Sequence, residues 1–317
     1  MSSPRALASP ASLKGSLSAT AAANALKEGF AAAGVDADAM PVADGGEGTV
    51  DVLCTEFEQV ETVDAFGRPR VARTGVLPDG TRVVEAAEAI PLDPSRLDVM
   101  AASSRGLGLW LGRYRDSPLV VTVGGTATMD AGAGLLDVLD GLAGPVRVLC
   151  DVATTLYDAP RLFGPQKGAT DAQVAELEAR FRADDRVAPF AGLPGSGAAG
   201  GLGAALASLG AELVPGADAV LDLLGFDPRP YDLVVTGEGT VDATTWEGKA
   251  PAVVAGRCAD AEIPCAVFGG HVLTSVPAIG RSQIELVALS GDPSCAEADL
   301  AALGETLGRR LDVLGSA

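Results

Sequence analysis

Apolar runs of strand length alternate along this chain with alanine-rich stretches of helical length, and small residues separate the two. The runs typical of buried strands are PLVVTVGG (118–125), PVRVLCD (145–151), YDLVVTGEG (231–239) and PCAVFGG (264–270). The helical stretches lie between or beyond them, at 16–33, 171–183, 249–259 and 296–314. This alternation favours an α/β fold with parallel sheets, because parallel strands need long and usually helical connections.

One stretch breaks the alternation. Residues 61–87 alternate apolar and polar side chains, with turn signals at Gly67 and at PDG (78–80). This pattern predicts a short run of antiparallel strands. The length of 317 residues is typical of two domains, so we expect a smaller mixed domain joined to a Rossmann-like one.

The charge balance excludes a general nucleic-acid binder. The chain has 42 acidic and 23 basic residues and a formal net charge of -19, whereas nucleic-acid phosphates require a basic face. The single histidine, His271, excludes a histidine-rich metal site and argues against a Ser-His-Asp triad. We interpret it as a partly exposed loop residue.

The cysteines and the hydropathy favour a cytoplasmic protein. The five cysteines are an odd number without paired metal spacing, which is typical of a reduced cytosolic chain. Cys258 and Cys265 are expected to pack between a helix and a strand. The first residues lack a basic start followed by an apolar core, and no stretch approaches the ~18 uncharged apolar residues of a membrane span.

Four glycine-rich segments carry the candidate chemistry. They are ADGGEGT (43–49), VGGTATMDAGAG (123–134), GSGAAGGLG (195–203) and VTGEGTVD (235–242), each expected as a loop with a helix next. Glycine lets the backbone approach a ligand, and a helix N-terminus adds positive potential, so such loops can hold phosphate. Three of them contain an acid, and phosphoryl transfer uses carboxylate-bound Mg²⁺. A purely structural glycine turn remains the alternative, and neither a P-loop nor a GxGxxG fingerprint is present.

Three lysines stand beside glycines: Lys14 in SLKGS, Lys167 in FGPQKGAT and Lys249 in WEGKAP. Each can hold a transferring phosphoryl group or a substrate carboxylate as a point charge. Each can equally be a solvated surface lysine.

The motifs SLKGSLSA, PVADGGEGT, GGTATMDAGAG, FGPQKGAT, AAGGLGAAL and VTGEGTVD…GKAP follow one another in this order. From about Ser9 to Gly270 the chain therefore resembles the glycerate kinase family of the bacterial glyoxylate/glucarate type. The resemblance implies two α/β domains with the active site in the cleft between them. One domain would be Rossmann-like and discontinuous (1–40 and 218–317), with a mixed α/β domain inserted (41–217). The implied activity is phosphorylation of D-glycerate to 2-phosphoglycerate, which depends on ATP and Mg²⁺.

The resemblance also implies roles for individual residues, although it does not name the catalytic base or the oligomeric state. Catalytic candidates are Lys14, Asp44 and Asp242. Candidates for binding the small hydroxy acid are Ser16, Gly45, Gly46, Glu47, Gly48, Thr49, Lys167 and Lys249. Candidates for binding the nucleotide are Gly124, Gly125, Thr126, Thr128, Gly237, Glu238 and Gly239, and the metal candidates are Asp151 and Glu238. For Asp44 and Glu47, a tight turn with a capping acid is the alternative.

Three departures fall on polar positions of the family motifs. Ala11 stands where the family has an aspartate, Met129 where it has an asparagine, and Thr240 where it has an arginine. A segment near 138–146 is also shorter. These changes leave three hypotheses open: an active kinase for D-glycerate or a related acid, a divergent paralog that binds a metabolite or partner without turnover, and a kinase for another acceptor.

Overall fold

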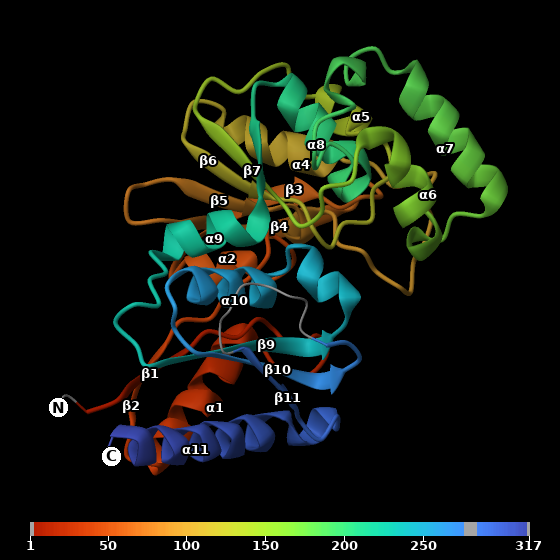
Figure 1. Cartoon of the computed structure of the whole chain (residues 1–317). Coiled ribbons are helices and arrows are strands. Elements are labelled where there is room, and N and C mark those ends of the chain that lie inside the picture. The colour runs from red at the N-terminus through yellow and green to blue at the C-terminus, as the bar shows by residue number, and fades with distance from the viewer. Residues whose placement is uncertain (1–2, 276–283, 316–317) are drawn as a thin grey trace. The chain divides into compact units, whose positions relative to one another are not determined.

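The structure is a computed structural model that describes residues 3–275 and 284–315 (Figure 1). The chain divides into two compact units. The terminal unit comprises Met1–Ala43 and Val220–Ala317, and the central unit comprises Asp44–Ala219. The division falls within helix α9 (Gly216–Leu224).

The terminal unit contains a five-stranded parallel sheet in the order β11-β10-β9-β1-β2. Its strands are β1 (Arg5–Ala8), β2 (Asp36–Ala39), β9 (Leu233–Val241), β10 (Cys265–Val272) and β11 (Ile284–Ala288). From β1 the chain moves to β2 on one side, and from β9 it moves to β10 and β11 on the other. The point between β1 and β9 is therefore a topological switch point, where open α/β sheets bind their ligands.

Helices cover both faces of this sheet. Figure 1 shows α1 (Ala19–Ala32) and α11 (Ala296–Gly315) on one face and α10 (Ala250–Asp260) on the other. Ser18 caps α1 by accepting the N–H of Ala21. Any side chain at Gly29 would overlap the backbone of α11, so this glycine allows the two helices to pack closely.

The central unit contains one six-stranded mixed sheet in the order β3-β4-β5-β6-β7-β8. Its strands are β3 (Glu56–Val63), β4 (Pro69–Val76), β5 (Arg82–Glu85), β6 (Leu119–Thr122), β7 (Val146–Cys150) and β8 (Glu212–Pro215). The first three pair antiparallel, which confirms the prediction for 61–87, and β5 to β8 pair parallel. The antiparallel run thus extends the parallel sheet through β5.

The central unit also contains seven α-helices: α2 (Thr49–Leu53), α3 (Ala86–Ala89), α4 (Arg105–Leu111), α5 (Ala133–Leu136), α6 (Ala159–Phe163), α7 (Asp171–Ala183) and α8 (Ala198–Ser208). The 3₁₀ turns of the two units are η1 (Gly112–Tyr114), η2 (Leu156–Asp158), η3 (Pro165–Lys167), η4 (Ala188–Phe190), η5 (Ala243–Glu247) and η6 (Pro293–Cys295). A capping box of Thr170 and Gln173 starts α7. Trp110 of α4 is fully buried and donates to the hydroxyl of Thr74, which joins the helix to β4.

Two expectations from the sequence were wrong in secondary structure. The segment 235–242 is not a loop, because β9 continues to Val241 and pairs with β10 as far as Val272. Pairing with β10 keeps this segment extended, and its backbone groups that face β10 belong to the sheet. His271 is exposed, but it lies on β10 and not in a loop.

The predicted packing of Cys258 and Cys265 between a helix and a strand is confirmed. Cys258 on α10 and Cys265 on β10 are both buried, and all five cysteines are free thiols. Over 3–275 and 284–315, no helix combines the length and the apolar character needed to cross a bilayer.

Candidate functional site

In the central unit, three predicted segments meet at the carboxyl ends of β5, β6 and β7. The loop 44–48 precedes α2, the turn at Gly124 follows β6, and Asp151 follows β7. A Cβ atom on Gly124 would lie 2.6 Å from the Cα of Gly46 and 2.8 Å from the Asp151 Oδ2 atom. The first two glycine segments therefore touch each other beside a carboxylate, and glycine is required there by close packing.

One of the two acids in the loop 44–48, Asp44, has a structural role. Asp44 Oδ1 accepts the N–H of Gly46 at 3.1 Å, and the buried hydroxyl of Thr49 donates to the Gly46 carbonyl at 2.7 Å. Gly45 and Gly48 have φ angles of 88° and 87°, in the left-handed region that favours glycine. Asp44 thus closes a turn, as the alternative interpretation proposed. The exposed side chain of Glu47 instead lies beside Gly125, where a Cβ atom would be 3.4 Å from the Glu47 Cβ.

A residue that the sequence analysis missed fixes this loop. Glu85, the last residue of β5, is only 3% exposed, and its two carboxylate oxygens accept the N–H groups of Gly48 at 2.9 Å and Val50 at 3.0 Å. Burial raises the pKa of Glu85, while the two backbone N–H groups oppose that rise. The signal in the sequence is an acid directly after the buried pair Val83-Val84, at the same sheet edge as Gly124 and Asp151.

Lys167 is not a surface lysine. Its side chain is 4% exposed, and its ammonium group donates to the carbonyl oxygen of Thr128 at 2.7 Å. Burial lowers the pKa of Lys167 to about 8, although the nearby Asp151 and Asp130 act in the opposite direction. A buried cation that lacks full compensation is typical of a ligand site.

A small cavity of about 80 Å³ connects Lys167 to the Gly124 turn. Its lining residues are Leu92, Val123, Gly124, Gly125, Thr126, Asp151, Val152, Phe163, Gln166, Lys167 and Ala199. It therefore joins residues predicted from three separate motifs for three different roles.

The second half of the segment 123–134 is structural. Asp130 accepts hydrogen bonds from the backbone of Ser104, Gly132 and Gly134 and from the Ser104 hydroxyl, at 2.8–3.2 Å. Met129 is fully buried in an apolar cluster that includes Leu156. The family's asparagine position therefore faces the core in this chain.

The third glycine segment packs against the second. Gly200 and Gly201 have φ angles of 70° and 94°, and the Gly200 carbonyl accepts the N–H of Ala131 at 3.0 Å. The Thr128 hydroxyl donates to the Ala199 carbonyl at 3.3 Å. The glycines of 195–203 thus allow two backbone segments to pack closely. The hydroxyl and the carbonyl of Thr128 both have hydrogen-bond partners within the protein.

In the terminal unit, the predicted residues gather at the switch point between β1 and β9. The N–H of Ala11 donates to the Gly237 carbonyl at 2.9 Å. Residues 13–17 then form a tight turn with the exposed Lys14 near its tip, and a Cβ atom on Gly239 would lie 3.7 Å from the Lys14 backbone nitrogen. Gly237 itself packs against Phe268, so its lack of a side chain is explained inside the sheet.

Glu238, at the same edge, is held by two neighbours. The Thr245 hydroxyl donates to Glu238 Oε1 at 2.7 Å, and Lys249 Nζ lies 3.6 Å from the same oxygen. Asp242 caps η5 by accepting from the N–H and hydroxyl of Thr244 at 2.8 Å and 2.6 Å, which lowers the pKa of Asp242. Thr245 is a second residue that the sequence analysis missed.

One predicted residue does not join this group. The hydroxyl of Ser16 donates to the Pro293 carbonyl at 2.8 Å, so this bond holds the turn of residues 13–17 against η6. The predicted cleft between two domains stays a prediction. No set of three or more potential metal-binding side chains occurs in the described parts of the chain.

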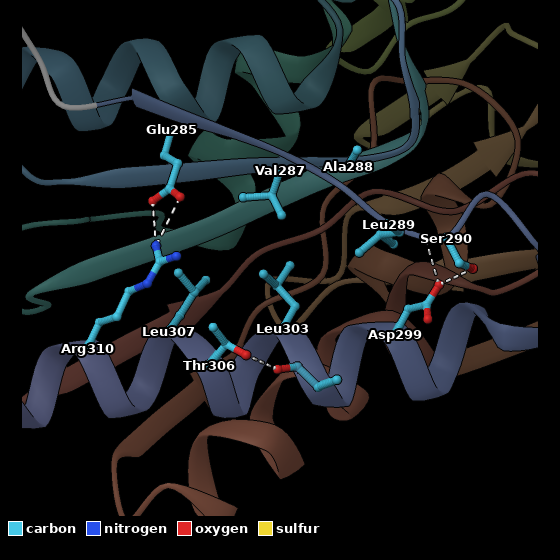
Figure 2. A pocket seen from close by; sticks show the side chains of 11 residues that line it. Glu285, Val287, Ala288, Leu289, Ser290, Asp299, Leu303, Thr306, Leu307 and Arg310 are labelled. Atoms are coloured by element: carbon cyan, nitrogen blue, oxygen red, sulfur yellow. Dashed lines mark hydrogen bonds and ion pairs between the residues drawn. The ribbon is translucent and has the colours of Figure 1, made fainter.

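A second cavity, of about 300 Å³, lies between β11 and α11 in the terminal unit (Figure 2). Figure 2 shows its polar groups paired with one another: Arg310 with Glu285 at 2.9 Å and 3.0 Å, and Ser290 with Asp299 at 2.6 Å. Leu303 and Leu307 line its apolar part. The first pair fastens α11 to the edge strand β11, and the second fastens α11 to the segment that follows this strand. None of the predicted site residues lines this cavity.

Comparisons with known proteins show which family this chain resembles. The model of the glycerate kinase family matches residues 6–143 and 140–309. The glycerate 2-kinase of Escherichia coli is 33% identical over 88% of this chain and 88% of its own length. The glycerate kinase of Bacillus subtilis is 33% identical over 87% of each chain. A crystal structure of a Salmonella typhimurium LT2 protein assigned as glycerate kinase 2 superposes with a TM-score of 0.82, at 27% identity over the whole of both chains.

Proposed function

This chain belongs to the glycerate kinase family, and we propose that it transfers the γ-phosphoryl group of ATP to D-glycerate. Members of the family are phosphotransferases, so a nucleotide and a small acid are the expected substrates. In the proposed reaction the C2 hydroxyl oxygen bonds to the γ-phosphorus, and the bond from that phosphorus to the β–γ bridging oxygen breaks. The products are 2-phosphoglycerate and ADP, and the hydroxyl proton leaves to a base within hydrogen-bond reach.

The observation that carries the proposal is the meeting of three motifs around Lys167 in the central unit. Glycine turns, a carboxylate and a buried ammonium group lie at the carboxyl ends of neighbouring parallel strands. That edge is where α/β sheets bind small ligands. A preformed positive group stabilises a negatively charged reactant without reorganisation at the moment of reaction.

We assign the phosphates of ATP to the switch point of the terminal unit. Lys14 is exposed beside Gly239, and Lys249 stands directly before α10. Lys14 would stabilise the transferring phosphoryl group as a point charge, and the half-buried Gly239 would leave room for the phosphates. The prediction that Gly237 contacts the nucleotide has less support, because this residue packs against Phe268.

Mg²⁺ would supply charge neutralisation of the phosphates when bound. A site with one or two carboxylates and phosphate oxygens is the usual arrangement for this ion. Asp151 fits that role because it stands beside the Gly124 turn. Glu238 fits less well, because Thr245 and Lys249 already hold one of its oxygens.

We also propose that the protein works in the cytoplasm. Four of its five cysteines are buried free thiols and the fifth is an exposed one, which is typical of a reducing compartment.

The second candidate is a paralog that binds ligands without turnover. Ala11 and Thr240, which replace polar residues of the family motifs, both lie near the switch point where we place the phosphates. If the replaced side chains stabilise the transition state, turnover would fall while ligands would still bind. A changed acceptor is the third hypothesis, and a screen of hydroxy acids separates it from the other two.

The test is release of ADP from Mg²⁺-ATP and D-glycerate, coupled to NADH oxidation, with Lys14→Ala as the comparison. Turnover above about 1 s⁻¹, in the usual range of enzymes, that is lost in Lys14→Ala would support the proposal. Absence of turnover together with calorimetric binding of ATP would favour the second candidate.

A further inference from the structure

We propose that the cavity between Lys167 and the Gly124–Thr126 turn binds the carboxylate of the acceptor acid, and that Thr126 donates a hydrogen bond to it. This inference rests on the proposed function and deepens it. It moves Gly124, Gly125 and Thr126 from the nucleotide, where the sequence placed them, to the hydroxy acid. The ligand class is a short monocarboxylic acid that carries a hydroxyl group.

The first step is the cation. Lys167 is 4% exposed, and one of the three N–H donors of its ammonium group goes to the Thr128 carbonyl. Enclosing an ammonium group is unfavourable unless negative charge and hydrogen-bond acceptors accompany it. The Thr128 carbonyl and the more distant charges of Asp151 and Asp130 supply part of this compensation. A carboxylate in the adjoining cavity would supply more.

The second step is independent of the lysine. Thr126 is 2% exposed, lines the same cavity, and its hydroxyl has no hydrogen-bond partner among the residues that the structure describes. Buried hydroxyl groups are nearly always hydrogen-bonded, so an unpaired one at a cavity wall indicates a missing acceptor. One carboxylate can accept from Thr126 and Lys167 together, because each of its oxygens has two lone pairs.

The third step concerns size. The cavity has about 80 Å³, whereas pockets for larger organic ligands usually span about 300 Å³ or more. Gly124 leaves no room for a side chain beside Gly46 and Asp151, and Leu92 and Phe163 form apolar walls. A carboxylate with a short carbon chain suits this space, whereas a nucleoside does not.

The fourth step concerns charge. Asp151 lines the same cavity, and Asp130 is close enough to act on Lys167. Two neighbouring carboxylates repel a doubly charged phosphate more strongly than a singly charged carboxylate. In the absence of a bound metal ion, the cavity therefore favours the acid group of the acceptor over a phosphate of the nucleotide.

The test measures steady-state constants of the full-length protein for both substrates, and calorimetric binding of D-glycerate without nucleotide. The variants are Thr126→Val, which removes the hydroxyl at nearly constant shape, Thr126→Ser, which restores it, and Lys167→Met. Thr20→Val and Lys27→Met, which change exposed residues of α1, are the matched controls. Thermal unfolding of each variant verifies that it is folded.

We expect Thr126→Val to raise the KM and Kd for D-glycerate about tenfold, the usual effect of one lost hydrogen bond to a charged group, and to leave the KM for ATP unchanged. Thr126→Ser should recover most of the loss, and Lys167→Met should show a larger loss in the same direction. Glyceramide, which lacks the carboxylate, should bind wild type at least about tenfold more weakly than D-glycerate.

Other outcomes overturn the inference. A rise in the KM for ATP alone would show that the Gly124–Thr126 turn binds the nucleotide. Equal binding of glyceramide and D-glycerate would show that the cavity does not bind the carboxylate. Lack of D-glycerate binding by the wild type would also show that the cavity does not bind the carboxylate of this acid. If D-glycerate binds with the expected dependence on Thr126 but no ADP forms, the proposed function fails and this inference stands.

Discussion

The carboxylate of Glu85 accepts the backbone N–H of Gly48 at 2.9 Å, and through this bond the end of β5 fixes the glycine loop that precedes α2. The same carboxylate accepts the N–H of Val50 at 3.0 Å. Gly48, the residue before the helix, has no side chain with which to cap it. Glu85, which is 37 positions away from Gly48 in sequence, therefore caps this helix.

Replacement of Glu85 by alanine should destabilise the protein by about 1–3 kcal/mol, because it leaves buried N–H groups without an acceptor. Urea denaturation measures this change. Glu61→Gln, at an exposed position of β3, is the control and should be nearly neutral. Equal stability of Glu85→Ala and Glu61→Gln would show that water replaces the carboxylate.

Replacement of Gly124 by alanine should destabilise the central unit and lower activity. The added methyl group would lie 2.6 Å from the Gly46 Cα and 2.8 Å from Asp151 Oδ2, and forcing atoms into such space costs about 1–3 kcal/mol. Gly256→Ala is the matched control, because a Cβ atom there meets nothing within 4 Å inside helix α10. That variant should gain up to about 1 kcal/mol from helix propensity. If both variants unfold at the same urea concentration, the close contact at Gly124 is wrong.

Replacement of Met129 by asparagine restores the residue of the family motif and should still harm the protein. The side chain is fully buried among apolar residues, so an amide there would lose packing and remain without hydrogen-bond partners, at a cost of about 2–4 kcal/mol. Met129→Leu, which keeps the volume, should cost less than about 1.5 kcal/mol. A gain in turnover for Met129→Asn would instead place this side chain in the active site.

Lys167 should give the protein a distinctive dependence of stability on pH. Its pKa is lowered from 10.5 to about 8 by burial, so between these values the unfolded chain binds more protons than the native one. The free energy of unfolding therefore rises with pH in this window, by on the order of 3 kcal/mol in total. Relative to Lys167→Met, the wild type should gain stability from pH 8 to pH 10.5, as followed by urea denaturation.

The comparison with Lys167→Met cancels the pH effects of other groups. Lys27→Met, at an exposed position of α1, should run parallel to the wild type over the same range. Parallel curves for wild type and Lys167→Met would mean that the ammonium group is hydrated or fully compensated.

Much of the fold follows from the sequence because its signals are local. Apolar runs and helical stretches predict most strands and helices, and the alternation at 61–87 predicts the antiparallel strands that the structure contains. The prediction of a loop at 235–242 is wrong because its two glycines resemble a turn, while pairing with β10 keeps the chain extended. Pairing between distant segments overrides a local turn signal.

The site could be predicted in its parts but not in its arrangement. Glycine beside Lys167 marked that residue, but its burial depends on Thr128 and on residues far along the chain. The role of Glu85 could not be predicted, because it depends on which strand ends beside the glycine loop. The family resemblance suggests that Met129 replaces a polar residue of the site, but its side chain packs in the apolar core.

The most direct test of the central claim is an assay that identifies the product. Purified protein, Mg²⁺-ATP and D-glycerate are mixed with enolase but without phosphoglycerate mutase, and phosphoenolpyruvate formation is followed by absorbance. Our account predicts immediate formation of phosphoenolpyruvate, because enolase accepts 2-phosphoglycerate directly, and loss of the signal in Lys167→Met. Formation of ADP without phosphoenolpyruvate would contradict the proposed product, and absence of both would contradict the kinase activity itself.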